Sequence, residues 1–116
     1  MTITERSVGD VTIMDIEGRI TVQDGADQFR DAVRQLVHRG RLKLVVNLAA
    51  VPYIDSTAMG QIVRAYTTAT RLGGGFKLLH VTVRVREILV VTKLRSVFDL
   101  FDVETEAVDS FGSARV

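Results

Sequence analysis

The residues best suited to chemistry form a short polar cluster, Asp55-Ser56-Thr57, between an apolar run and a stretch with helical apolar spacing. The first turn of a helix has unsatisfied backbone N–H groups and the positive end of the helix dipole, so it stabilises an anion such as phosphate. A hydroxyl in that turn is well placed to become a phosphoester. The added phosphate brings about −1.5 to −2 charges, enough to change a docking surface without refolding the domain.

The same cluster also has a purely structural interpretation. Asp and Ser are preferred residues at the N-cap of a helix, where a side-chain oxygen accepts a backbone N–H of the first turn. Spacing alone favours this simpler interpretation, in which Asp55 or Ser56 only starts a helix. Both interpretations stay open at this point.

A strand and a helix must position the cluster. The run Leu42–Leu48 is almost continuously apolar, which is typical of a central strand covered on both faces. Pro52 ends the extended segment, and a helix is predicted from Asp55 or Ser56 to the glycines at 73–75. One face of this helix carries Met59, Ile62, Val63, Tyr66 and Ala69.

The segments before this unit alternate between strand and helix periodicity. Ile3–Arg6 and Val11–Ile16 predict an antiparallel hairpin, and Arg19–Thr21 a short third strand. A first helix is predicted over residues 22–39, with Thr21 and Asp24 resembling a capping box.

The segments after the unit continue the alternation. Phe76–Leu79 and Phe98–Phe101 are predicted strands, separated by a short helix around Val85–Leu89. A weaker terminal helix is predicted over Thr105–Ala114, where Gly112 disfavours it. Together these elements predict an α/β domain in which helices pack against a mixed central β-sheet.

Composition narrows the function classes. The 116 residues are 47% hydrophobic, which suits one domain over residues 1–116. With no cysteine and only His38 and His80, far apart in sequence, we expect no metal site, thiol chemistry or cofactor. No apolar run reaches the roughly 18 residues of a membrane span, and the net charge is +1. We therefore expect a cytoplasmic protein that neither inserts in membranes nor binds nucleic acid.

The small net charge conceals an uneven distribution. Residues 34–95 contain eleven basic and two acidic residues, whereas the segments before and after each carry a net charge of −4. The simpler expectation is that the segments interleave in the fold and neutralise one another. A functional basic face is the alternative, and Arg84, Arg86, Lys93 and Arg95 are one candidate for it, facing an acidic partner.

Known catalytic motifs do not fit the polar cluster. A serine hydrolase elbow requires Gly-x-Ser-x-Gly, and Ile54-Asp55-Ser56-Thr57-Ala58 has neither glycine. The glycines at 73–75 are not followed by the Gly-Lys-Ser/Thr of a phosphate-binding loop. We expect that the protein is not an enzyme.

Two linked segments resemble the signature of a known family. Leu44–Leu48 and Val51–Gly60 are similar to the strand and the Asp-Ser-Ser/Thr-Gly helix start of STAS domains, specifically the bacterial anti-sigma factor antagonists. Ile16–Ile20 and Val81–Leu89 also fit the family pattern, as do Thr92–Leu94 and Val97–Phe98, so the resemblance covers nearly the whole chain.

The resemblance implies a STAS-like α/β fold and a partner switch that regulates transcription, as in bacterial stress responses. The unmodified antagonist would bind an anti-sigma factor that is also a serine kinase, and thereby free a sigma factor. Phosphorylation of the antagonist would release it, and a PP2C-type phosphatase would reset the cycle.

The family's site residues carry over to named positions. Ser56 matches the phosphoacceptor, Asp55 the acid before it and Thr57 the second hydroxyl. Asn47 matches the polar residue at the end of the strand, which implies a place near the site.

The expected partner-binding surface includes two departures from the family. Ala58 replaces the usual glycine, and Thr21 replaces an aspartate found in many members. With these two residues, we expect the face formed by Met59, Ile62 and Val63 beside Ser56 to be the apolar centre of the docking surface.

A second role within the same family also stays open. The domain could be an interaction subunit of a lipid-transport or other membrane-associated complex, in which the same helix docks a partner and Ser56 is never phosphorylated.

Overall fold

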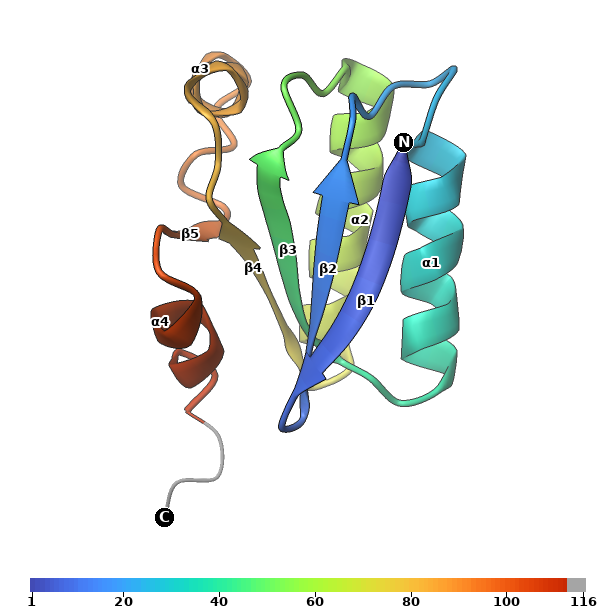
Figure 1. The fold of residues 1–116 in the computed structure, drawn as a ribbon, viewed down its shortest axis with the longest axis vertical. Helices are drawn as coiled ribbons and strands as arrows, with labels where there is room; N and C mark the ends of the chain where they lie inside the picture. The colour runs from blue at the N-terminus through green and yellow to red at the C-terminus, as the bar shows by residue number, and fades with distance from the viewer. Residues whose placement is uncertain (113–116) are drawn as a thin grey trace.

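The chain folds around one mixed five-stranded β-sheet in a computed structural model that describes residues 1–112. The strand order is β1-β2-β3-β4-β5; β1 is antiparallel to β2, and every later pair is parallel (Figure 1). The strands are β1 (Thr2–Val8), β2 (Val11–Glu17), β3 (Lys43–Ala50), β4 (Gly75–Leu79) and β5 (Asp99–Phe101), and the helices are α1 (Ala26–His38), α2 (Ser56–Arg71), α3 (Val83–Val91) and α4 (Glu104–Asp109).

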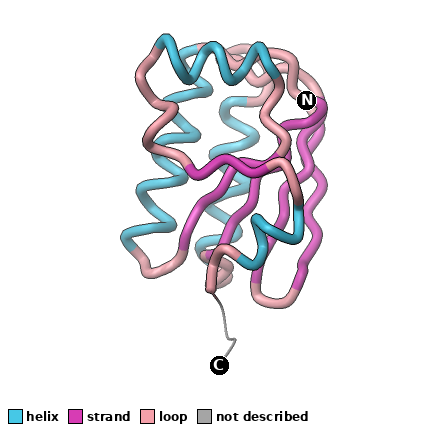
Figure 2. The backbone as a smooth tube through the Cα atoms, turned by 90° about the vertical axis from the view of Figure 1, so that its left-hand side faces the viewer, coloured by secondary structure: helices cyan, strands magenta, loops and turns pink. Residues whose placement is uncertain are grey.

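The two long helices cover one face of the sheet. Crossovers between parallel strands are almost always right-handed, and here they advance in one direction across the sheet, which puts α1 and α2 on the same side. Figure 2 shows this layering from the side. The main core lies between the layers, where Leu44, Val46 and Leu48 of β3 meet Phe29 of α1 and Ile62 of α2.

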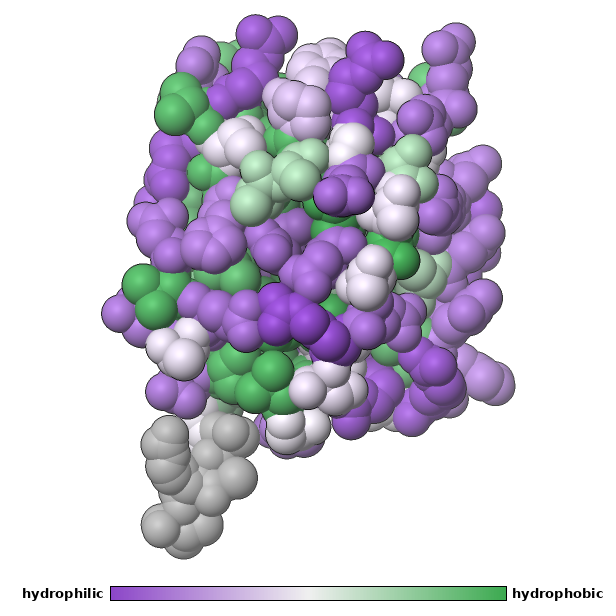
Figure 3. Space-filling model, in the orientation of Figure 1, coloured by the Kyte–Doolittle hydropathy of each residue, from purple (hydrophilic) through white to green (hydrophobic). Residues whose placement is uncertain are grey.

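The opposite face of the sheet is only partly covered. The short α4 lies against β4 and β5, and its Ala107 belongs to a second, smaller cluster with Ile13, Val45 and Leu79. The rest of this face is largely hydrophilic (Figure 3). Because strand side chains alternate between faces, odd-numbered residues of β3 point to this open side.

Most of the predicted architecture is confirmed. The α/β class, the amino-terminal hairpin, the central strand β3 and the start of α2 at Ser56 all agree with the structure.

The predictions for residues 19–39 are partly wrong. Arg19–Thr21 is no strand, because it forms only isolated bridges, including one between Ile20 and Ile54. The helix starts at Ala26 and not at 22, because Thr21 and Asp24 close a turn through their backbones and Gly25 follows with φ of 103°. That left-handed conformation favours glycine and separates the turn from the helix.

The terminal helix is shorter than predicted. It spans Glu104–Asp109, and Gly112 has φ of 63° three residues after its end. The predicted end, Ser113 and Ala114, lies outside the described residues.

Candidate functional site

The loops that follow β2 and β3 meet at one edge of the sheet. These are parallel neighbouring strands, so their carboxyl ends lie together (Figure 1). The backbone joins the two loops: the Ile20 N–H donates to the Tyr53 carbonyl at 3.0 Å, and the Asp55 N–H donates to the Ile20 carbonyl at 3.1 Å. The β2–α1 loop is therefore held against the start of α2.

Asp55 connects this loop to the helix with its side chain. It is the N-cap of α2, and its Oδ1 accepts the Ala58 N–H at 2.8 Å. Its Oδ2 accepts the Val22 N–H from the neighbouring loop, also at 2.8 Å. One carboxylate thus satisfies a backbone donor of the helix start and a donor of the loop beside it, which sequence reasoning did not anticipate.

Ser56 and Thr57 occupy the first turn of α2 and are exposed. Within the described part of the chain, neither hydroxyl makes a side-chain hydrogen bond, and both are open to solvent. The first-turn N–H groups and the helix dipole favour an anion here. Ser56 therefore meets the geometric requirements of a phosphoacceptor: an accessible hydroxyl on a firmly capped helix end.

The start of α3 completes this edge. The Thr82 hydroxyl donates to the Val51 carbonyl at 3.2 Å, which attaches the start of α3 to the loop before Ser56. The Arg84 guanidinium lies 5.6 Å from the centre of the Tyr53 ring, within cation–π range. Val83 stands between these two contacts.

Two valines at this edge are unusually exposed. Val22 is 60% exposed in the β2–α1 loop, and Val83 is 75% exposed at the start of α3. Exposed apolar patches rimmed by polar residues mark protein interaction sites, and here the two valines flank the aromatic ring of Tyr53 in the chain segments that meet at this edge. We call Val22, Tyr53, Ser56, Val83 and Arg84 the loop edge. Ser56 was a predicted site residue and Arg84 a candidate for a basic face, whereas Val22, Tyr53 and Val83 were not predicted. The signal for the two valines is that neither belongs to the apolar face of a predicted helix or strand.

The predicted apolar docking face is corrected by the structure. Ala58, Met59 and Ile62 are 0%, 4% and 1% exposed and belong to the main core, so they offer no surface to a partner. Val63 is half-buried and also packs against the core. The half-buried Thr21 accepts the Asp24 N–H at 3.1 Å with its hydroxyl, so it shapes the loop that presents Val22.

Asn47 lies on the opposite face of the sheet from α2. Its amide donates to Asp15 Oδ1 at 2.8 Å, and its own oxygen accepts the Ala49 N–H at 3.1 Å. The structure thus brings together Asp55, Ser56 and Thr57 but connects Asn47 to a different group of residues.

That group is an ion-pair network on the open face of the sheet. Arg6 donates to Asp15 at 2.6 Å and to Glu104 of α4 at 2.6 Å. The Arg6 hydrogen bonds lower the pKa of both carboxyls, and the Asn47 hydrogen bond lowers the pKa of Asp15 further, while partial burial opposes the shift. The network joins β1, β2, β3 and α4.

Neither a membrane-spanning helix nor a metal-binding cluster is present in the described residues. Across residues 1–112, no helix has both the length and the apolar character needed to cross a membrane. Among these residues there is also no group of three or more His, Cys, Asp or Glu side chains that could hold a metal ion.

Comparison with known proteins identifies the family. The family model of the STAS domain matches residues 2–107. The chain belongs to the STAS domain family. A Thermotoga neapolitana relative, named as a candidate anti-sigma factor antagonist, is 28% identical over 103 residues, which cover 88% of this chain and 90% of the relative.

Solved structures agree with this assignment. The crystal structure of a candidate anti-sigma factor antagonist from Thermotoga maritima has a TM-score of 0.88 and 25% identity, covering 95% of this chain and 94% of the other. The antagonist SpoIIAA, a cell fate determinant of Bacillus, has been solved unphosphorylated and phosphorylated. The unphosphorylated form has a TM-score of 0.74 and 16% identity, covering 97% of this chain and all of SpoIIAA, a likeness of fold alone.

Proposed function

We propose that this STAS domain is an anti-sigma factor antagonist that is released from its partner when Ser56 is phosphorylated. The partner would be an anti-sigma factor with serine kinase activity, whose capture frees a sigma factor for transcription. The antagonist would act in the cytoplasm as a substrate and regulator, with no catalytic step of its own. A PP2C-type phosphatase would restore the unmodified form.

The observation that carries this proposal is the exposed Ser56 at the first position of α2, directly after Asp55. Asp55 holds both the helix and the β2–α1 loop, so the hydroxyl is presented on a fixed surface. Relatives named as antagonists match most of the chain, and SpoIIAA, which shares the fold, is known in a phosphorylated form.

Release follows from charge at the loop edge. A phosphate on Ser56 places about −1.5 to −2 charges beside the Asp55 carboxylate. The helix end tolerates this charge because its N–H groups and dipole favour anions, so the domain stays folded. A partner that covers the loop edge would have to desolvate two neighbouring anions, which weakens binding.

The proposal is tested by phosphorylation with a matched control. The protein is incubated with ATP and each candidate anti-sigma kinase, and the phosphate is located by mass spectrometry. We expect one phosphate on Ser56, lost in Ser56→Ala and kept in Thr57→Ala, since Thr57 is the neighbouring exposed hydroxyl of the same turn.

Phosphate on Thr57, or none with any kinase that binds the protein, would contradict the proposal. Stable binding without phosphate transfer would instead support the alternative role as an interaction subunit of a lipid-transport or other membrane-associated complex.

A further inference from the structure

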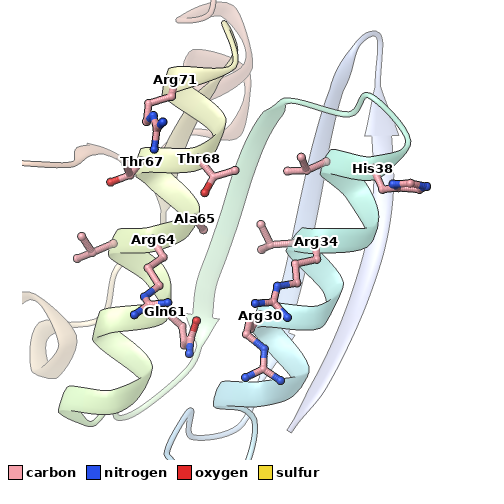
Figure 4. A pocket seen from close by; sticks show the side chains of 12 residues that line it. Arg30, Arg34, His38, Gln61, Arg64, Ala65, Thr67, Thr68 and Arg71 are labelled. Atoms are coloured by element: carbon pink, nitrogen blue, oxygen red, sulfur yellow. The ribbon is translucent and has the colours of Figure 1, made fainter.

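A groove runs between α1 and α2 on the side of the helices that faces away from the sheet. It has a volume of about 530 Å³. Figure 4 shows Arg34 of α1 pointing into it, opposite Gln61 and Thr68 of α2, whereas His38 points outward. The groove begins more than one helical turn after Ser56 and continues to Arg71, so it is separate from the loop edge.

The groove is basic and contains uncompensated charge. Its lining includes four arginines, Arg30, Arg34, Arg64 and Arg71, and no acidic residue. Arg30 is neutralised by Asp27 and Asp31 at 3.1 and 3.2 Å. Within residues 1–112, Arg34, Arg64 and Arg71 form no ion pair, although other basic residues, such as Lys43 with Asp10, do.

The floor of the groove is apolar. Val33 and Ala65 are buried at its base, 5% and 4% exposed, and the half-buried Val37 and Val63 lie beside them. Basic residues on both helices therefore flank a strip of small aliphatic side chains.

We propose that this groove docks an acidic amphipathic helix of a partner protein. An apolar stripe on that helix would lie on Val33, Val37 and Val63, and its carboxylates would pair with Arg34, Arg64 and Arg71. This is the recognition mode in which an amphipathic helix lies in a groove. From Gln61 to Arg71 the groove extends about 15 Å at 1.5 Å per residue, which suits roughly three turns of partner helix.

The distribution of charge favours a helix over a lipid headgroup. Arg64 and Arg71 are seven residues apart on α2, or about 10 Å along the axis, so the charges form a row and do not converge on one phosphate. A membrane surface would also leave the concave floor uncovered.

A second copy of this chain is also disfavoured. Its acidic helix α4 is only six residues long, and Ala107 and Val108 on it already pack against the sheet. Glu104 of that helix is paired with Arg6. Residues 1–112 therefore contain no free acidic amphipathic helix that a second copy could offer.

Fluorescence anisotropy with a designed probe tests the proposal. The probe is a labelled acidic peptide of about fourteen residues, with leucines along one helical face, and its control is a scrambled peptide of the same composition. We expect Arg34→Glu and Arg64→Glu each to weaken binding of the amphipathic peptide about tenfold. Arg95→Glu, an exposed arginine outside the groove, should leave binding unchanged, and so should Ser56→Asp, which separates this site from the proposed phosphoswitch.

When the peptide is added, the backbone amide NMR chemical shifts of residues 30–38 and 61–71 should change. Three results would overturn the proposal. The first is equal affinity for the scrambled peptide, which would indicate charge attraction alone. The second is Arg64-dependent sedimentation with phosphatidylglycerol vesicles in place of peptide binding, and the third is Arg64-dependent dimerisation in analytical ultracentrifugation.

Discussion

Asp55 performs two structural tasks with one carboxylate. Its Oδ1 caps α2 through Ala58, and its Oδ2 holds the β2–α1 loop through Val22. The exposed Ser56 hydroxyl beside it takes no part in these bonds, so the proposed phosphoacceptor is a different residue from the one that positions it. Phosphorylation can then change the surface while the framework stays intact.

Because Asp55 holds both the helix and the loop, its removal should destabilise the domain. Asp55→Ala should lower the free energy of unfolding by about 1–2 kcal/mol, because it loses an N-cap and leaves the Val22 N–H without its partner. Urea denaturation measures the loss, and Asp55→Asn should recover much of it because asparagine also caps helices. An Asp55→Ala protein as stable as the wild type would contradict the assigned role.

At this scale the sequence predicted that the helix begins at Asp55 or Ser56, but not which residues those two side chains contact. The N-cap and phosphoacceptor interpretations are compatible, because Asp55 is the cap and the neighbouring Ser56 hydroxyl stays exposed. The Val22 contact depends on a turn closed by Gly25, which strand and helix periodicity do not reveal. The place of Asn47 could have been predicted: it alternates with Leu48, so it faces away from α2.

Helix α2 has one face buried in the core and an exposed start, so we assign stability to the first and recognition to the second. Ala58, Met59 and Ile62 face the core, while the exposed end joins the loop edge with Val22 and Val83. Helical spacing in the sequence correctly identified one apolar face. The spacing could not show that the sheet buries this face, because hydrophobic periodicity indicates an amphipathic helix but not which surface covers its apolar side.

Paired substitutions test this separation. Ile62→Ala should lower the free energy of unfolding by about 2–5 kcal/mol, as buried aliphatic truncations do, with unchanged partner affinity in the folded fraction. Val83→Asp should change stability by less than about 0.5 kcal/mol, since the site is exposed and the helix start favours an acid.

The same Val83→Asp variant should bind the anti-sigma partner about tenfold more weakly in calorimetry. The loop edge would not be the docking surface if Val83→Asp kept full affinity while Ile62→Ala lost it.

The Arg6 network joins α4 to the sheet and gives the stability of the protein a pH dependence. Arg6 lowers the pKa of Asp15 and Glu104 in the folded protein. In the unfolded chain these carboxyls take up protons at higher pH, near their usual values of about 4. The network therefore stabilises fully above that range, and its contribution is lost as the pH falls through the lowered folded-state values.

Arg6→Gln should be about 1 kcal/mol less stable at neutral pH, in keeping with partly exposed ion pairs. Its stability should also fall less between neutral pH and pH of about 3 than that of the wild type. Urea denaturation across this range measures both effects. Parallel pH profiles for the two proteins would show that the network contributes nothing.

Over the whole molecule, the basic residues in the middle of the chain form two groups: some are paired with acidic residues and others line the groove. The first group pairs with acids from the chain ends: Lys43 with Asp10, Lys77 with Asp99 and Arg39 with Glu5. This confirms the expected interleaving. The groove arginines Arg34 and Arg64 stay outside these pairs, so a basic face coexists with neutralisation.

With a net charge of +1, one phosphate makes the whole domain slightly negative. The change is concentrated at one edge, because the loop edge and the groove occupy different parts of the surface. The domain could thus lose one partner at Ser56 while it keeps another between α1 and α2.

The most direct test of the account is the affinity of the anti-sigma partner for two preparations of this protein, unmodified and phosphorylated on Ser56 alone. Isothermal titration calorimetry measures both dissociation constants, with Ser56→Ala as a form that cannot be modified. We predict that Ser56→Ala matches the unmodified protein and that the phosphorylated form binds at least about tenfold more weakly, a difference of about 1.4 kcal/mol. Equal affinity of the phosphorylated and unmodified forms would contradict the switch.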